Sequence, residues 1–149
     1  MLPAERVKNK REFVLPLSPA AAEIIRQQPV RADRDLVFGD RVGGFSGWSR
    51  CKERLDERIA KANGGKPLPD FTIHDLRRSA ATHMAEIGVQ PHIIEAVLNH
   101  VSGHKGGIAG IYNRATYEKD KRDALIRWAD WLVATVEGRK STIVPLRTA

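Results

Sequence analysis

The chain has 149 residues, with 25 Lys and Arg against 18 Asp and Glu and a formal net charge of +7 at pH 7. One domain is the default at this length, and 42% hydrophobic residues supply enough apolar surface for a core, which excludes wholesale disorder. The single Cys51 excludes a disulfide framework, and no apolar run is long enough to span a membrane. We expect a cytoplasmic protein whose positive charge favours a polyanionic partner, nucleic acid above all, although an anionic membrane surface would suit the same charge.

The N-terminal residues predict a β-hairpin. Residues 7–17 have a polar centre at Asn9 and an apolar stretch that is closed by Pro16. We expect the returning strand near residues 12–15.

Two helices and a short extended segment are expected next. Ser18 followed by Pro19 predicts an N-cap and a first helical position, so residues 20–28 should form a short helix. Residues 36–38 should be briefly extended, and a charged helix should cover residues 49–62.

The pattern around residue 72 predicts the start of another helix. Thr72 and Asp75 have the spacing of a capping box, and Gly88 should end the helix. The predicted apolar stripe of this helix comprises Leu76, Ala80, His83, Met84 and Ile87. Within it, we expect His83 to be buried and hydrogen-bonded.

Two further helices are expected over residues 91–99 and 116–137, and residues 138–149 form a separate tail outside the domain of residues 1–137. The predicted apolar stripe of the last helix comprises Tyr117, Ala124, Leu125, Trp128, Trp131, Leu132 and Thr135. The two tryptophans suit base stacking as well, but we expect them to anchor this helix to the core.

Three polar residues follow Thr72 at helical spacing. At roughly 100° per residue, Arg77 lies on the flank of the apolar stripe and Arg78 nearly opposite it. We therefore expect Arg77 to be partly desolvated and Arg78 to point to water. His74 lies one turn before Arg77, so both side chains suit one phosphate, although the same spacing is common in a solvated pair.

Several motifs occur in a fixed order, and together they resemble the tyrosine recombinase (phage integrase) family. They are the Lys8 segment of residues 7–18, the His-x-x-Arg motif in residues 71–78, the Val-Leu-Asn-His motif of residues 97–100, and Tyr112 in residues 111–114. The resemblance covers residues 3–136. It implies a mainly α (α+β) fold, namely a helical recombinase catalytic domain with a small N-terminal β-hairpin or sheet remnant.

The resemblance also implies roles for five residues. Tyr112 would attack a DNA phosphodiester and form a 3′-phosphotyrosyl link, with His74 as the general acid/base. Arg77 and His100 would donate to the non-bridging phosphate oxygens, and Lys8 would protonate the departing 5′-oxygen. No metal and no nucleotide cofactor is required.

Each of these roles has a competing interpretation. Lys10 competes with Lys8, and His100 suits a structural role in closing its turn, where Asn99 departs from the glycine that is usual in the family. Tyr112 is preferred to Tyr117 because Tyr117 belongs to the apolar stripe of the last helix.

Further basic residues are expected at the DNA. Lys10, Lys105 and Arg114 suit phosphate contacts, and equally suit solvated surface charges. The expected partner is double-stranded DNA at an attachment site, with no membrane involved.

Family members also carry a first catalytic arginine upstream of the hairpin, and neither Arg6 nor Arg11 stands in the helical context that it needs. We therefore expect a truncated catalytic domain for site-specific DNA recombination or integration, and the alternative is an inactive DNA-binding fragment of an integrase. An exposed edge strand beside the hairpin would favour self-association through residues 7–17, besides the self-association expected in a synaptic complex.

Overall fold

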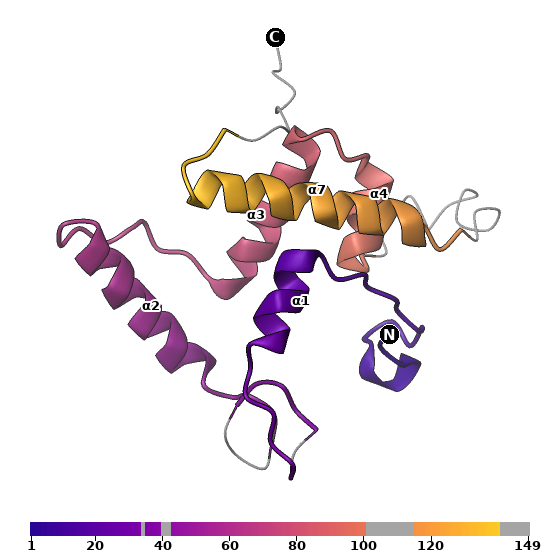
Figure 1. Cartoon of the computed structure of the whole chain (residues 1–149), viewed down its shortest axis with the longest axis horizontal. Helices are drawn as coiled ribbons and strands as arrows, with labels where there is room; N and C mark the ends of the chain where they lie inside the picture. Colours follow the sequence, from indigo (N-terminus) through magenta and orange to yellow (C-terminus); the bar gives the residue numbers. More distant parts are fainter. Residues whose placement is uncertain (34, 40–42, 101–114, 141–149) are drawn as a thin grey trace. The chain divides into compact units, whose positions relative to one another are not determined.

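The structure is a computed structural model that describes residues 1–33, 35–39, 43–100 and 115–140. Its elements are, in chain order, η1 (Ala4–Arg6), α1 (Pro19–Arg26), α2 (Trp48–Ala62), α3 (Ile73–Glu86), α4 (Pro91–Leu98) and α7 (Glu118–Val136) (Figure 1). Helices predominate, which confirms the mainly helical class that the sequence predicts. Among the described residues, no helix has the length and apolar character that crossing a membrane requires.

The chain divides into two compact units. The first comprises Met1–Glu23 with Arg78–Ala149, and the second comprises Ile24–Arg77. Each unit is described by itself below.

The N-terminal region differs from the predicted hairpin. Leu2 and Phe13 form one isolated antiparallel bridge, with N–O distances of 2.8 and 2.9 Å, and η1 occupies the chain between them. The region doubles back as expected, but no strand forms within the described residues because a two-stranded ribbon without further partners is only marginally stable. The edge strand through which residues 7–17 were predicted to self-associate is therefore absent from this part of the chain.

Side-chain caps begin two of the helices as predicted. The Ser18 hydroxyl accepts from the N–H of Ala21 at 3.3 Å, and α1 starts at Pro19. The Asp75 carboxylate reaches back to the N–H and hydroxyl of Thr72 at 2.9 and 2.8 Å, which is the acidic half of a capping box. These contacts satisfy donors that the first turn of a helix leaves unpaired.

The first unit has a core between the second half of α3, α4 and α7. Met84 and Ile87 are 1% and 2% exposed, and Ala124 of α7 is buried against them. Partly buried residues packed on this core include Tyr117, Leu125, Trp128 and Trp131, which confirms most of the predicted stripe of α7 and the anchoring role of the tryptophans.

The predicted stripes are longer than the faces that are buried. Leu76 of α3 and Leu132 of α7 are 53% and 38% exposed, and Thr135 is also exposed. Periodicity marks one side of each helix, but burial extends only as far as a neighbouring element covers that side.

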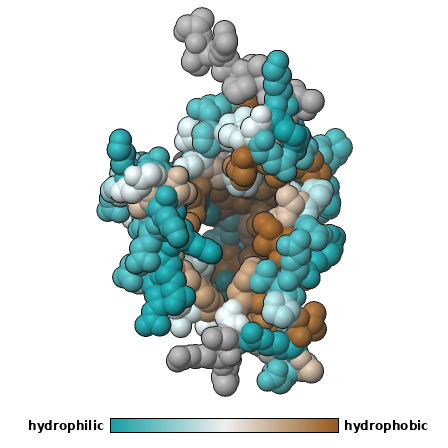
Figure 2. Space-filling model, turned by 60° about the vertical axis from the view of Figure 1, so that its left-hand side comes forward, coloured by the Kyte–Doolittle hydropathy of each residue, from teal (hydrophilic) through white to brown (hydrophobic). Residues whose placement is uncertain are grey.

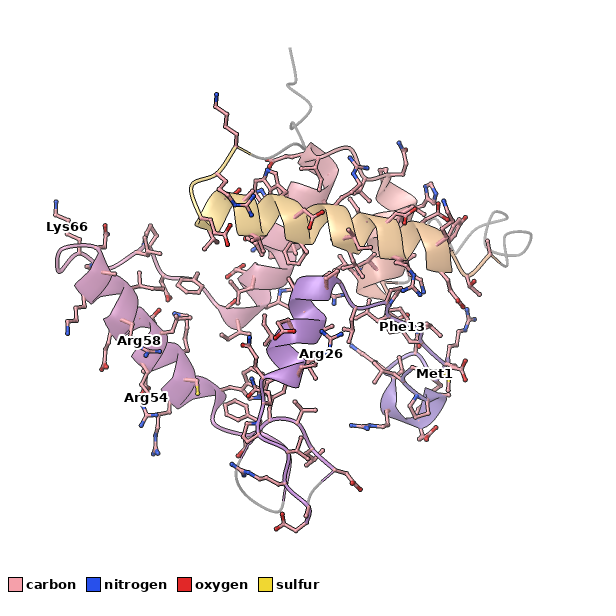
Figure 3. All side chains as sticks on the ribbon, viewed as in Figure 1. Met1, Phe13, Arg26, Arg54, Arg58 and Lys66 are labelled. Carbon is pink, nitrogen blue, oxygen red and sulfur yellow. The ribbon has the colours of Figure 1, made fainter. Side chains whose placement is uncertain are left out.

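One buried charge joins α7 to the N-terminal region. Lys121 is 4% exposed, and its Nζ donates to the carbonyl oxygen of Val14 at 2.6 Å and lies 5.3 Å from the centre of the Phe13 ring (Phe13 is labelled in Figure 3). The apolar stem of the side chain packs within the unit while its ammonium group binds backbone and ring. Residues 12–15 are thereby held against α7 without a sheet.

Candidate functional site

Lys8 lies in a tight turn at the N-terminus. The N–H of Lys10 donates to the carbonyl oxygen of Val7 at 2.9 Å, and Lys10 itself has a positive φ of 55°. Within the turn, the Oδ1 of Asn9 accepts from the N–H of Arg11 at 3.2 Å. Lys8 and Lys10 are both exposed, so the turn presents two ammonium groups to solvent.

A long-range hydrogen bond joins this turn to the end of α4. The Nδ2 of Asn9 donates to the Oδ1 of Asn99 at 3.0 Å, across 90 residues of sequence, and the bond is partly buried. Lys8 precedes Asn9 and His100 follows Asn99, so the bond brings together the two segments that carry these predicted site residues.

Asn99 ends α4 in a way that explains its departure from glycine. Its backbone is left-handed, with φ 49° and ψ 37°, a conformation in which glycine is usual and Asn is among the best tolerated alternatives. The N–H of His100 then donates to the carbonyl oxygen of Glu95 at 2.9 Å, which closes the helix end. His100 follows this fixed turn and is exposed. Its backbone closes the turn, and its imidazole is left to solvent.

A cavity of about 230 Å³ lies among these segments in the first unit. It is lined by Asn9, Arg11, Glu12, Phe13, Val14, Glu95, Ala96, Asn99, His100, Ala115, Thr116, Glu118 and Lys121. Its wall contains cationic and imidazole donors as well as carboxylates. Of the predicted site residues, the lining includes His100 but not Lys8, and the Lys121 ammonium in the wall already donates to Val14.

His74 and Arg77 lie on the first turns of α3, which the Thr72–Asp75 cap begins. Both are exposed, and so is Arg78, which corrects the predicted difference between the two arginines. The apolar stripe is covered only from Ala80 onward, so the flank on which Arg77 lies is not desolvated. His74 and Arg77 belong to the second unit, whereas Lys8 and His100 belong to the first.

Three predicted residues, Tyr112, Lys105 and Arg114, lie outside the described residues. The competing Tyr117 is the N-cap of α7 with a positive φ of 51°, and it packs on the core. Its ring lies 5.2 Å from the ring of His92. The place expected for Tyr117 in the core is thus confirmed, although it precedes α7 instead of lying within it.

His83 is less buried than predicted. Its side chain is 39% exposed, its Nδ1 lies 2.9 Å from the Oε2 of Glu86, and its ring lies 4.6 Å from that of Trp131. The expected hydrogen bond is present, but the imidazole lies at the margin of the core instead of within it.

An arginine stripe on α2, formed by Arg50, Arg54 and Arg58, was not among the predicted site residues. All three are exposed, and none makes a hydrogen bond or ion pair within the described residues. Their i, i+4, i+8 spacing places them on one face of the helix, and Figure 3 shows Arg54 and Arg58 on neighbouring turns. The i, i+4, i+8 spacing of these arginines can be read from the sequence, so it could have predicted the stripe.

The opposite face of α2 is occupied. The Nζ of Lys52 lies 2.6 Å from the Oδ2 of Asp56 and 4.0 Å from the centre of the Phe71 ring. At 100° per residue, this face lies roughly 180° from the arginine stripe. α2 therefore has one face that packs on residues 67–71 and another that is basic and solvated. Hydrophilic residues cover much of the surface drawn in Figure 2.

Comparisons with known proteins identify the family to which the chain is similar. Residues 2–119 match the phage integrase family. The prophage integrase IntA of Escherichia coli (strain K12) is 30% identical over 138 residues, covering 92% of this chain and 32% of that protein. The prophage integrase IntZ of the same organism is 31% identical over 150 residues, covering 97% of this chain and 34% of that protein. The chain thus spans about a third of the length of these relatives, and no solved structure matches it.

Proposed function

Because the chain belongs to the phage integrase family, we propose that it takes part in site-specific recombination by cleaving and rejoining DNA strands through Tyr112. The proposed substrate is double-stranded DNA at an attachment site. Recombination exchanges strands between two DNA sites, so the active form is an assembly of several copies in a synaptic complex.

The proposed cleavage step uses five side chains and no cofactor. The hydroxyl oxygen of Tyr112 forms a bond to phosphorus while the bond from phosphorus to the 5′-oxygen breaks. His74 accepts the phenol proton, and Lys8 gives a proton to the departing 5′-oxygen. Arg77 and His100 donate to the non-bridging oxygens as negative charge develops on them. The products are a 3′-phosphotyrosyl link and a 5′-hydroxyl, and attack by another 5′-hydroxyl reverses the step.

The observation that carries this proposal is the hydrogen bond between Asn9 and Asn99. It joins the turn of Lys8 to the turn of His100, and this supports the proposal that both side chains act on the same phosphodiester. Catalysis of phosphoryl transfer depends mainly on such fixed donors at the phosphate.

DNA binding in this proposal uses charges beyond the reacting phosphate. The arginine stripe of α2 is solvated and has no competing carboxylate partner among the described residues, as expected for contacts to successive phosphates. We include Lys10, Lys105 and Arg114 in the same role. Phosphate contacts of this kind position the protein on the duplex without reading its sequence.

A suicide DNA substrate tests the proposal. The DNA is nicked near the cleavage site, so that the released fragment diffuses away and the covalent intermediate accumulates. We expect a protein–DNA adduct on a denaturing gel that Tyr112→Phe abolishes, whereas Tyr117→Phe retains it as the matched control.

Two other outcomes have defined meanings. Salt-sensitive DNA retention without any adduct would contradict cleavage by this chain and support the DNA-binding fragment without chemistry. Absence of DNA retention at low salt would contradict strand cleavage and also the alternative of DNA binding without chemistry.

A further inference from the structure

We propose that Asn9 and Asn99 are a positioning pair, whose carboxamide hydrogen bond fixes the turn of Lys8 relative to His100 during strand cleavage. This inference rests on the proposed function. It assigns a role to two residues that hold the catalytic side chains without contacting the phosphodiester themselves.

The carboxamide of Asn9 is held at both of its ends. Its Oδ1 accepts from the N–H of Arg11 at 3.2 Å, and its Nδ2 donates to Asn99 at 3.0 Å. The first bond stabilises the turn that contains Lys8, and the second attaches that turn to α4. Because the second bond is partly buried, water competes with it less than at an open surface.

Asn99 supplies both a left-handed backbone and a side-chain acceptor, whereas glycine would supply only the backbone conformation. Glycine supplies a left-handed backbone at lower steric cost than Asn, so the turn after α4 alone does not require a side chain. The carboxamide adds an acceptor for Asn9, directly before His100. Asn99 therefore ends the helix and tethers a distant segment at the same position.

Apart from the bond of Asn9 and the buried side chain of Val7, the described attachments of this N-terminal region lie outside the turn of Lys8. The backbone bridge of this region joins Leu2 to Phe13, and the bond from Lys121 reaches Val14. Val7 within the turn is buried, at 9% exposure, so its packing also holds the turn, and the bond between Asn9 and Asn99 is the described long-range hydrogen bond nearest to Lys8. Breaking it should loosen the turn after Val7 while leaving the core of Met84 and Ile87 intact.

Two substitutions by uncharged residues should remove the bond between Asn9 and Asn99 and retain the local turns. Asn99→Gly keeps the left-handed backbone and removes the acceptor. Asn9→Ser keeps an oxygen that can accept from Arg11, but its side chain is too short to reach Asn99. The matched control is Asn63→Gly, which removes a carboxamide from the end of α2, where its described hydrogen bond is local and goes to the carbonyl oxygen of Lys66.

Single-turnover cleavage at saturating DNA is the first measurement. Each single substitution should lower the rate constant by about 10- to 100-fold with the Kd for DNA unchanged, because misplaced groups slow the chemical step. The double variant should be no slower than the slower single variant, since both substitutions remove the same bond. Multiplied effects, a change confined to Kd, or rates as high as those of Asn63→Gly would overturn the positioning pair.

NMR of the ¹⁵N-labelled chain gives a second measurement that does not depend on activity. Asn99→Gly should shift the side-chain amide resonance of Asn9 and the backbone amides of Lys8 and Lys10, and Asn63→Gly should leave them in place. Unchanged resonances would contradict the pair, even if cleavage is observed. Shifted resonances in a chain that forms no adduct would instead contradict the proposed function while retaining the structural tie.

Discussion

The two units of the chain are stabilised in different ways. The first unit holds the described buried residues, with a core around Met84 and Ile87, and the turns of Lys8 and His100 are attached to it. In the second unit, no residue between 24 and 77 that the structure describes is buried. Helix caps and pairs such as Lys52 with Asp56 order it locally.

The proposed reaction has two requirements, and the two units differ in how they meet them. Groups that act on one phosphodiester must be held still. The packed core of the first unit supports the turns of Lys8 and His100, whereas the first turn of α3, with His74 and Arg77, is held by the Thr72–Asp75 cap in the second unit. Contacts to successive phosphates need exposed charge more than rigidity, and the arginine stripe of α2 provides it. Substitutions in the first unit should therefore affect folding and cleavage, whereas those on the stripe should affect DNA affinity.

The largest expected effect comes from the core. Ile87→Ala should lower the free energy of unfolding by about 2–5 kcal/mol, because it removes buried methyl groups and leaves a cavity. Ile24→Ala is the matched control in the second unit, where the side chain is 57% exposed, and it should cost less than about 1 kcal/mol. Urea denaturation followed by circular dichroism measures both. Equal losses of stability would contradict the contrast between the units.

A smaller loss is expected at the buried ammonium group. Lys121→Met retains an apolar stem but leaves the carbonyl oxygen of Val14 without this donor, so unfolding should become easier by about 1–3 kcal/mol. Lys119→Met is the control on the same helix, because its side chain is 88% exposed and its 3.4 Å pair with Asp123 should contribute little. If both variants unfold at the same urea concentration, Lys121 does not hold residues 12–15.

The arginine stripe should affect binding without a comparable effect on folding. Replacing Arg50, Arg54 and Arg58 together by Gln should reduce the salt dependence of DNA binding, by about 0.9 in the logarithmic slope for each phosphate that is no longer neutralised. Fluorescence anisotropy at several salt concentrations measures this slope. As a single-charge comparison, Arg54→Gln should weaken binding more than Lys52→Gln, and the reverse order would place the DNA on the other face of α2.

The smallest effect is expected at the cap of α3. Asp75→Ala removes the acceptor for the N–H and hydroxyl of Thr72 and should cost about 0.5–2 kcal/mol. Thermal unfolding measures the change, and the first turn of α3, with His74 and Arg77, should fray. A variant with an unchanged melting temperature would show that this cap contributes nothing to stability.

Local signals in the sequence predicted most of the helices and their ends. The helix-start signals at Ser18 and at Thr72 with Asp75 are local, because their side chains bond to backbone within three residues. The helix-end signal at Gly88 is local as well, and Gly88 has a positive φ of 81° where α3 ends. Asn99 was singled out only as a departure from glycine, since the left-handed backbone that it supplies is visible only in the structure.

Long-range contacts could not be predicted in the same way. The bond between Asn9 and Asn99 spans 90 residues, and the sequence around one asparagine does not indicate that the other is its partner. Lys121 lies in a charged run that suggests solvent, although its position four residues after Tyr117 and four before Leu125 puts it on the core stripe. The reverse error occurred at Leu76, whose periodicity fits the stripe but which no neighbour covers.

Mass spectrometry of the trapped adduct tests the central claim most directly. Trypsin separates the two tyrosines of the chain, because Tyr112 lies in residues 106–114 and Tyr117 in residues 115–119. After nuclease and trypsin digestion, the account predicts a nucleotide 3′-phosphate linked to the peptide that contains Tyr112. The same mass on the peptide of Tyr117, or on any peptide lacking Tyr112, would contradict strand cleavage by this residue.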